Sequence, residues 1–253
     1  MKRPTAILLT LAMFLFLAAC GSENGEGTPT ESQPSVSTQE PANSPTENGS
    51  EDDTTISVDP ADGDDTRQGS NILVAYFSRV GNTVWADGVD AVTSASLNVV
   101  NGEFAGNAQL LAQMAQAVTD GDLFLIQTVD TYPSDYRETT NVASVEQSDN
   151  ARPALATHVS NMDQYDTIVL IYPNWWGTLP QALYTFLEEY DFSGKTILPL
   201  CTHEGSRMGS SERAIAGLCP GATLLDGLAV RGASAASAQS EVETWINSSG
   251  ILG

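Results

Sequence analysis

Ile168-Val-Leu-Ile-Tyr-Pro-Asn-Trp-Trp-Gly-Thr-Leu-Pro180 is the stretch of the chain that decides its fold. The aliphatic and aromatic run that opens it ends at Pro173, a pattern that predicts a buried strand leading into a rigid loop. Trp175 and Trp176 are neighbours in that loop, and two neighbouring side chains cannot both point into the same core. We therefore expect at least one tryptophan to face a crevice; the alternative is that both pack the end of the sheet against the following helix.

A second loop of small residues follows the next predicted strand. It reads His203-Glu-Gly-Ser-Arg-Met-Gly-Ser-Ser211, and its glycines would let the backbone approach a ligand closely. The loops beyond the carboxyl ends of adjacent parallel strands form the ligand crevice of an open α/β sheet. One loop would bring flat aromatic surface and the other backbone N–H groups, a pair that suits a planar heteroaromatic ring. His203 and Glu204 would meet a ring edge, although a solvated loop is the simpler interpretation of Glu204.

Strands and helices alternate along residues 71–253. Strands are predicted at 71–77, 123–129, 166–172, 195–201 and 223–230, and helices at 107–119, 135–148, 179–189, 210–218 and 236–247. This alternation predicts βαβ units and therefore an α/β fold with a five-stranded parallel sheet. Residues 84–106 show no firm periodicity and are interpreted as an insertion.

The first 20 residues are typical of an export signal. Lys2-Arg3 precedes an apolar run that is closed by Leu17-Ala-Ala-Cys20-Gly21, the pattern of a secretory signal with small residues at its cleavage site. A cysteine in this place resembles a bacterial lipobox, so Cys20 is expected to become the lipidated first residue. The alternative is an ordinary cleaved signal in which Cys20 has no role.

Residues 21–70 are predicted to be a disordered tether. They are rich in Ser, Thr, Pro, Glu and Asp and contain almost no large apolar side chain, so they cannot bury enough surface to fold. As a flexible coil of this length, the segment would reach about 40 Å. We therefore expect it to hold residues 71–253 at the outer face of the cytoplasmic membrane, attached through the lipid at Cys20.

Charge and cysteine content exclude several classes of function. Residues 71–253 carry seven bases and 20 acids, a net charge near −13, and no basic stripe that would neutralise nucleic-acid phosphates. Two histidines and two cysteines, Cys201 and Cys219, are too few for a zinc or iron–sulfur site. An exported location permits a disulfide between these cysteines, but the apolar run around Cys201 favours a buried thiol.

The loop after the first strand, Ser78-Arg-Val-Gly-Asn-Thr83, has the composition of a weak anion site. Its hydroxyl and backbone donors, together with a helix N-terminus, can hold a phosphate with little help from lysine or arginine. Neither G-x-x-x-x-G-K-[ST] nor G-x-G-x-x-G is present. Taken alone, an ordinary strand-to-helix connection explains this loop equally well.

Taken together, these and several further segments resemble the flavodoxin-like family of FMN-binding proteins, in its bacterial flavodoxin and NAD(P)H-quinone-reductase branch. The resemblance covers nearly all of residues 71–253 in the family's order and implies a flavodoxin-like three-layer sandwich. The segments that carry it are Tyr76-Phe-Ser-Arg-Val-Gly-Asn-Thr83, Tyr132-Pro-Ser-Asp-Tyr136, Asn150-Ala-Arg-Pro153, Tyr165-Asp166, Tyr172-Pro-Asn-Trp-Trp-Gly-Thr-Leu-Pro180, Phe186-Leu-Glu-Glu-Tyr-Asp-Phe-Ser-Gly-Lys195 and Cys201-Thr-His-Glu-Gly-Ser-Arg-Met-Gly-Ser-Ser211.

The resemblance implies a set of FMN-binding residues. Those for the phosphate are Ser78, Arg79, Gly81, Asn82, Thr83 and the helix start at Asn107 and Ala108. Those for the ribityl chain and the ring are Pro173, Asn174, Trp175, Trp176 and Gly177. Those for the other side of the ring are Thr202, His203, Glu204, Gly205, Ser206 and Gly209. The family runs from Gly-Asn-Thr straight into its first helix, whereas here 84–106 intervene, so either Thr83 or Asn107 would serve the phosphate.

The resemblance and the export signal together imply a redox function outside the cytoplasm. FMN would carry the electrons, and the partner would be a membrane quinol or a redox protein. Two alternatives are an FMN-dependent reductase of quinones or similar aromatics, and a binding lipoprotein whose flavodoxin fold has lost the cofactor. The acidic surroundings disfavour added negative charge on a flavin, so a low reduction potential is expected.

Overall fold

The computed structural model describes residues 71–87 and 95–253. The expected signal peptide, the lipidated Cys20 and the tether 21–70 lie outside the described residues. Among those described, no helix is both long enough and apolar enough to cross a membrane.

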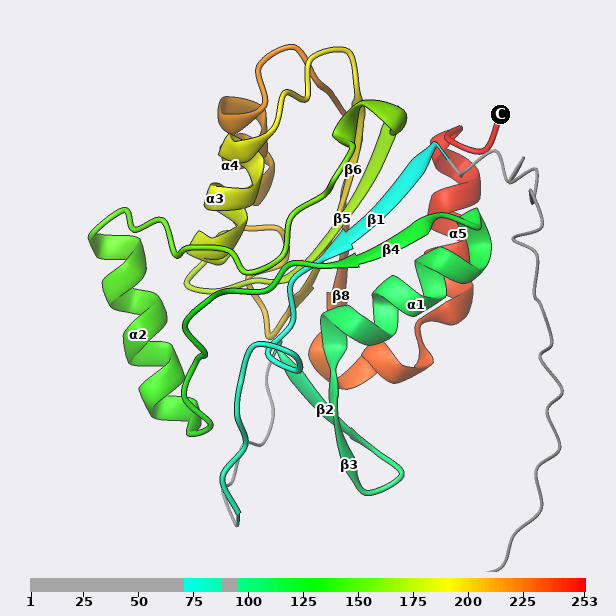
Figure 1. Ribbon diagram of the computed structural model, residues 1–253. Helices are drawn as coiled ribbons and strands as arrows, with labels where there is room; N and C mark the ends of the chain where they lie inside the picture. Colours follow the sequence, from blue (N-terminus) through cyan, green and yellow to red (C-terminus); the bar gives the residue numbers. More distant parts are fainter. Residues whose placement is uncertain (1–70, 88–94) are drawn as a thin grey trace, which may run out of the picture. The chain divides into compact units, whose positions relative to one another are not determined.

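A parallel sheet organises the domain (Figure 1). Its strands run in the order β4–β1–β5–β6, and the last position is shared by β7 and β8, which both pair with β6. Every pairing in this sheet is parallel. The strands are β1 (Ile72–Tyr76), β4 (Asp122–Leu125), β5 (Thr167–Pro173), β6 (Thr196–His203), β7 (Thr223–Leu224) and β8 (Leu228–Arg231). This is the doubly wound order in which a ligand crevice opens between β1 and β5.

Helices cover both faces of the sheet, α1 and α5 on one side and α3 and α4 on the other, while α2 stands beside them (Figure 1). The three-layer α/β fold predicted from the sequence is confirmed. The helices are α1 (Asn107–Thr119), α2 (Tyr136–Ser148), α3 (Gln181–Glu189), α4 (Ser211–Leu218) and α5 (Gln239–Ser249), with short 3₁₀ turns η1 (Met162–Gln164) and η2 (Gly232–Ser237).

The central strands are buried on both faces because they separate two cores. Leu73, Ala75 and Phe77 point into the core beneath α3 and α4. Ile72 and Val74 point into the core beneath α1 and α5. A strand covered on both sides reads as a continuous apolar run, which is why the sequence around β1 and β5 predicted their positions well.

The segment 84–106 contains structure that the sequence interpretation missed. Its second half forms an antiparallel hairpin of β2 (Leu97–Val100) and β3 (Glu103–Gly106). Asn101 and Gly102 connect the strands with φ angles of 54° and 85°. Asn-Gly is the preferred pair for such a turn, because both central residues need positive φ.

The final strand differs from its prediction as well. Residues 223–230 were expected to form one strand, but the chain leaves the ladder between β7 and β8. There the Gly227 N–H donates to Glu212 Oε1 (3.1 Å), and the Asp226 carbonyl accepts from the Trp245 indole N–H (3.1 Å). Helices α4 and α5 thus supply the hydrogen bonds that the sheet loses.

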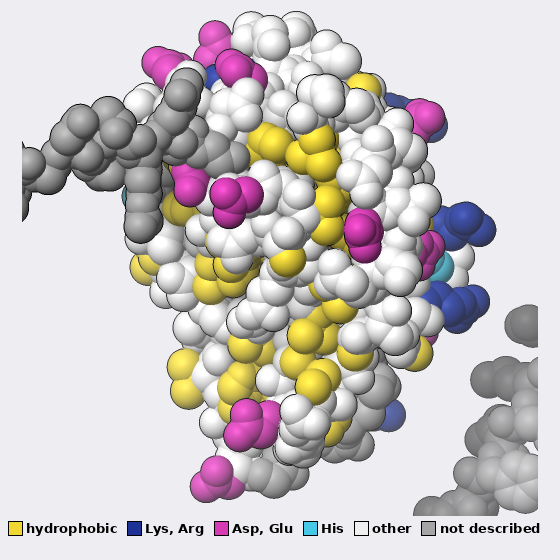
Figure 2. Space-filling model, turned by 90° about the vertical axis from the view of Figure 1, so that its right-hand side faces the viewer, with side chains coloured by type: hydrophobic (Ala, Val, Ile, Leu, Met, Phe, Trp, Pro, Cys, Tyr) yellow, Lys and Arg dark blue, Asp and Glu magenta, His cyan; other side chains and the backbone are white. Residues whose placement is uncertain are grey.

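The face that carries α1 and α5 shows no continuous basic stripe (Figure 2). Its acidic side chains are scattered, and its basic side chains gather near one edge. Both cysteines of the domain are buried and free, so the buried-thiol interpretation of Cys201 is confirmed and the disulfide is absent.

Candidate functional site

A cavity of about 490 Å³ opens where β1, β5 and β6 end, a volume within the roughly 300–1,000 Å³ range of small-molecule sites. Three loops and one face of α2 enclose it. The lining residues are Arg79, Ala95, Ser96, Tyr136, Thr139, Thr140, Ala143, Asn174, Trp175, Trp176, Gly177, Glu204 and Ser206. The structure thus brings Arg79, Asn174, the two tryptophans, Gly177, Glu204 and Ser206 together as predicted from the sequence.

Trp176 presents an open aromatic surface to this cavity. Backbone hydrogen bonds between Trp175 and Thr178 close a two-residue turn around it. Trp176 and Gly177 occupy the turn with φ angles of 51° and 83°. The Trp176 indole N–H donates to the Thr140 carbonyl (3.0 Å), yet 59% of the residue remains exposed. The ring is therefore held in place while part of its surface stays available for stacking.

The left-handed backbone at Trp176 leads to a prediction about stability. A non-glycine residue pays about 1–2 kcal/mol in this conformation, and asparagine tolerates it best. Both Trp176→Asn and Trp176→Leu lose the indole hydrogen bond, but only the first creates the Asn-Gly pair that this turn prefers. We expect the Asn variant to be about 1 kcal/mol more stable than the Leu variant in urea unfolding. Equal stabilities would show that the turn is unstrained.

Trp175 has a packing role. Its ring meets those of Phe77 (centroids 5.3 Å apart) and Tyr132 (5.1 Å) nearly edge-on, and its indole N–H donates to Ser96 Oγ (2.9 Å). The sequence allowed two roles for these tryptophans, facing a crevice or packing the end of the sheet, and each role is taken by one of them. Trp176 faces the crevice, and Trp175 packs the end of the sheet while also lining the cavity.

The turn after β1 contains buried donors without partners. Among the described residues, Ser78 Oγ, Arg79 Nε and Thr83 Oγ1 have no hydrogen-bond partner. Buried polar groups are nearly always hydrogen-bonded, so three in one turn point to an anionic ligand.

Asn82 and Gly81 shape this turn. Asn82 Nδ2 donates to the carbonyls of Ser78 (2.9 Å) and Ile126 (3.0 Å), and its Oδ1 accepts from the Thr128 N–H (2.8 Å). Gly81 has a φ of 97°. The amide of Asn82 is therefore committed to holding the turn against the end of β4, and a role of Asn82 in binding would pass through its backbone.

Arg79 is the basic side chain that lines the cavity. Only 2% of it is exposed, and its Nη2 donates to the carbonyls of Pro133 (2.7 Å) and Ser134 (3.0 Å). The guanidinium carbon lies 5.1 Å from the centre of the Trp85 ring. Burial lowers the pKa of Arg79, and the charge of Asp135 opposes that shift. These contacts fix the side chain and leave Nε without a partner.

The start of α1 is covered by residues 95–97. The Asn107 N–H donates to the Ser96 carbonyl (3.0 Å), and Asn107 Nδ2 donates to the carbonyls of Ala95 and Leu97. Ala108 is buried, and the Thr202 hydroxyl also donates to the Ala95 carbonyl. Asn107, Ala108 and Thr202 are thus close to the cavity but do not line it.

Gly106, the residue before α1, packs directly against Ser78. A Cβ at this position would overlap Ser78 Oγ and would lie 3.2 Å from Ser78 Cβ. The turn after β1 and the first turn of α1 therefore meet closely, although 22 residues separate Thr83 from Gly106.

The loop 203–210 is fastened to the tryptophan loop. The Gly177 carbonyl accepts from the Ser210 N–H (2.8 Å), and Asn174 Nδ2 donates to the Arg207 carbonyl (2.8 Å). A Cβ at Gly209 would overlap the Gly177 carbonyl, so Gly209 permits this contact. His203 and Gly205 line a separate hollow. Pro173 pairs with Thr202 in the sheet, behind the cavity.

The comparisons with known proteins agree with this geometry. A family model described as Flavodoxin matches residues 98–249. The chain belongs to the flavodoxin family. A crystal structure of a provisionally named flavoprotein from Bacteroides uniformis is 29% identical, with a TM-score of 0.54 over 71% of this chain and 99% of that one. Another from Bacteroides eggerthii is 26% identical, with a TM-score of 0.54 over 71% and 98%.

A flavoprotein from Lactobacillus acidophilus in complex with FMN is 18% identical, with a TM-score of 0.46 over 69% of this chain and 97% of that one. No curated protein sequence matches the chain significantly. In the part of this flavodoxin-family chain that the structure describes, no group of three or more metal-binding side chains occurs.

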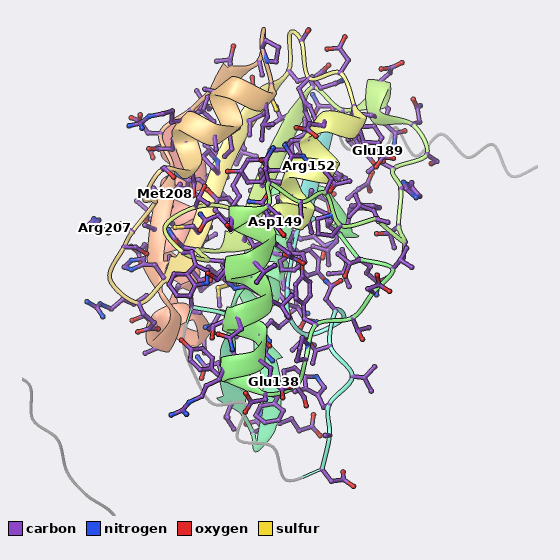
Figure 3. The ribbon with its side chains drawn as sticks, turned by 90° about the vertical axis from the view of Figure 1, so that its left-hand side faces the viewer. Glu138, Asp149, Arg152, Glu189, Arg207 and Met208 are labelled. Atoms are coloured by element: carbon purple, nitrogen blue, oxygen red, sulfur yellow. The ribbon has the colours of Figure 1, made fainter. Side chains whose placement is uncertain are left out.

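Helix α2 supplies a wall of the cavity that the sequence interpretation missed. The four residues that line the cavity, Tyr136, Thr139, Thr140 and Ala143, follow the i, i+3, i+4, i+7 spacing of one helical face. Figure 3 shows this helix lengthwise, with Glu138 near its start and Asp149 at its end. Asp135 caps it by accepting from the Glu138 N–H (2.9 Å). The i, i+3, i+4, i+7 spacing was present in the sequence, but two of the four residues are polar threonines, so it did not indicate an inward-facing surface.

Glu146, on the same helix, gives a pH-dependent prediction. It accepts a hydrogen bond from the Tyr132 hydroxyl (3.1 Å), and burial raises the pKa of Glu146 while that bond offsets part of the rise. The folded protein thus prefers the protonated form, and its contribution to stability is lost as the pH rises through the folded-state pKa. We expect Glu146→Gln to melt at a higher temperature than the wild type at pH 8. The difference should vanish near pH 4, where the wild-type carboxyl is also protonated; a constant difference would contradict this.

Proposed function

We propose that the chain binds FMN in this cavity and transfers electrons at the outer face of the cytoplasmic membrane. The observation that carries the proposal is that Arg79, whose Nε lacks a partner, lines the same cavity as the exposed ring of Trp176. Ser78 and Thr83, in the same turn as Arg79, add two buried hydroxyls without partners. The donors suit a phosphate and the indole suits a flat ring. Membership of the flavodoxin family supports the same cofactor.

Bound FMN would supply the electron chemistry, and the chain would bind and orient it. Arg79, Ser78 and Thr83 would hold the phosphate. Trp176 would stack on the ring, held by its hydrogen bond to Thr140. Glu204 and Ser206 line the cavity from the loop after β6, and the carboxylate of Glu204 would disfavour negative charge on the ring. The low reduction potential expected from the sequence follows from the same reasoning.

The membrane location rests on the sequence around Cys20 and on the acidic segment 21–70. Nicotinamide nucleotides are expected to be scarce outside this membrane, which favours a membrane quinol or a redox protein as the partner. Replacement of Cys20 by serine should move the protein from the membrane fraction to the soluble fraction. An unchanged distribution would argue against the lipid anchor and leave the FMN site untouched.

A visible absorption spectrum tests the cofactor. Protein produced from Gly21 onward should be yellow, or should become so when FMN is added and the excess is removed. A colourless protein that takes up no FMN would favour the cofactor-free binding lipoprotein. Electron exchange between the loaded protein and isolated membranes then tests the role as a carrier.

A second candidate is reduction of quinones or similar aromatic molecules. The aromatic residues of the cavity favour it. Trp176 and Tyr136 both line the cavity, and 59% and 41% of their surfaces are exposed. A planar substrate would bury this aromatic surface. Saturable steady-state reduction of quinones by the FMN-loaded protein would identify an enzyme, and absence of turnover would favour the carrier.

A further inference from the structure

The end of β6 and the loop that follows it, residues 203–207, separate the cavity from a second hollow of about 320 Å³. Its residues alternate between the two: Glu204 and Ser206 line the cavity, whereas His203, Gly205 and Arg207 line the hollow. We call this second site the arginine hollow; its lining residues are His203, Gly205, Arg207, Ala229, Val230, Arg231, Ser234 and Glu241.

Two guanidinium groups in the arginine hollow have no acidic partner. Elsewhere Arg152 pairs with Glu188 (2.6 Å), and Lys195 donates to the Met162 and Tyr165 carbonyls. In the described part of the chain, the side chains of Arg207 and Arg231 make no ion pair and no hydrogen bond. Arg137 and Arg213 make no ion pair among the described residues either, so the distinguishing feature of Arg207 and Arg231 is that both line the same hollow.

The backbone holds Arg207 in a fixed, left-handed conformation. Its φ is 52°, and its carbonyl accepts from Asn174 Nδ2 (2.8 Å) and from Cys201 Sγ (3.2 Å). In Figure 3 Arg207 lies at the outer edge of the molecule, on the loop that precedes α4. The tertiary structure therefore maintains an uncommon conformation that directs this side chain outward, as at many functional positions.

His203 is a buried residue that lines the arginine hollow. Its Nδ1 accepts from the Gly205 N–H (2.9 Å), and its ring also makes a hydrogen bond with the Ala229 backbone. Burial lowers the pKa of His203, and the charges of Arg231 and Arg207 lower it further. The two arginines bring positive charge to the site, and the carboxylate of Glu241 offsets part of it.

We propose that the arginine hollow binds an oxyanion group, phosphate or carboxylate, of a small molecule. Arg207 and Arg231 offer planar, multiply donating groups from two different elements, and Ser234 adds a hydroxyl. The domain's net charge near −13 repels a large acidic protein surface at long range, whereas a small anion reaches a local positive site at little cost. The site is independent of FMN, although the shared loop places it beside the cavity.

Calorimetric titration with inorganic phosphate at low ionic strength tests the proposal on the chain from Gly21 onward. The double variant Arg207→Gln/Arg231→Gln should bind phosphate at least about tenfold more weakly than the wild type. The matched control, Arg137→Gln/Arg213→Gln, removes two exposed arginines elsewhere and should bind as the wild type does. Any contribution of Arg79 is the same in all three proteins.

Glu241→Gln provides a test that does not depend on removing an arginine. Glu241 is the acidic residue among the described residues that line the hollow, and its loss should tighten phosphate binding about two- to fivefold. If phosphate binding weakened equally in both arginine double variants, the loss of net charge alone would explain the effect, and the proposal would be overturned. A wild-type protein that binds no phosphate, whether or not it is loaded with FMN, would also overturn it.

Discussion

Replacement of Arg79 by glutamine is expected to weaken FMN binding by about 10- to 100-fold and to leave riboflavin binding almost unchanged. Riboflavin lacks the phosphate, so the comparison isolates the group that Arg79 would hold. Charge-assisted hydrogen bonds to phosphate are the strongest available in this turn, and burial of Arg79 limits their screening by solvent. Quenching of flavin fluorescence measures both affinities.

Arg137 supplies the control for this experiment. It lies on α2 one residue after Tyr136, is exposed, and has no ion pair among the described residues. Arg137→Gln removes the same charge near the cavity and should change FMN affinity by less than about threefold. Equal losses for FMN and riboflavin in Arg79→Gln would mean that Arg79 acts through the 133–134 carbonyls and not through the phosphate.

Replacement of Gly106 by alanine is expected to destabilise the protein by about 1–3 kcal/mol and to remove FMN binding. The backbone at Gly106 (φ −74°, ψ 124°) suits any residue, so the cost would arise from contacts of the new Cβ, chiefly the overlap with Ser78 Oγ and to a smaller extent the close approach to Ser78 Cβ and Gln109 Cβ. To relieve it, the hydroxyl would have to turn away from the position in which it lacks a partner. Urea unfolding and flavin titration measure the two effects.

The double variant Ser78→Ala/Gly106→Ala tests the cause. It removes the colliding oxygen and leaves a Cβ-to-Cβ distance of 3.2 Å, which small shifts can accommodate. Most of the stability should return, whereas FMN affinity should stay low because the hydroxyl is gone. If stability does not return, the loss in Gly106→Ala has another origin.

Continuous apolar runs made most of the fold predictable from the sequence. The strands at 72–76 and 167–173 are buried on both faces, and the helix at 107–119 was predicted with its observed bounds. The hairpin 97–106 was missed although Asn101-Gly102 is a strong turn signal, because its strands are partly exposed and lack a regular alternation. The break between β7 and β8 depends on hydrogen bonds from Glu212 and Trp245, which only the folded chain brings together.

The candidate site was predictable where it follows strand ends and not where it depends on tertiary contacts. The loops containing Arg79, Trp176 and Ser206 meet because parallel strands end at one edge of the sheet. Ala95 and Ser96 reach the cavity through hydrogen bonds to Thr202 and Trp175, distant in sequence. The division of the 203–207 loop between two sites likewise requires the position of β8.

The two edges of the sheet affect how readily copies of the protein aggregate at high concentration. One border is β4, only four residues long, and the other is interrupted between β7 and β8. Long, flat, unpaired borders invite a neighbouring copy to add its own strand and begin aggregation. Short and broken ones offer little template for such growth. Under the proposed lipid anchoring, many copies on one membrane would meet often, and these edges would limit strand pairing between them.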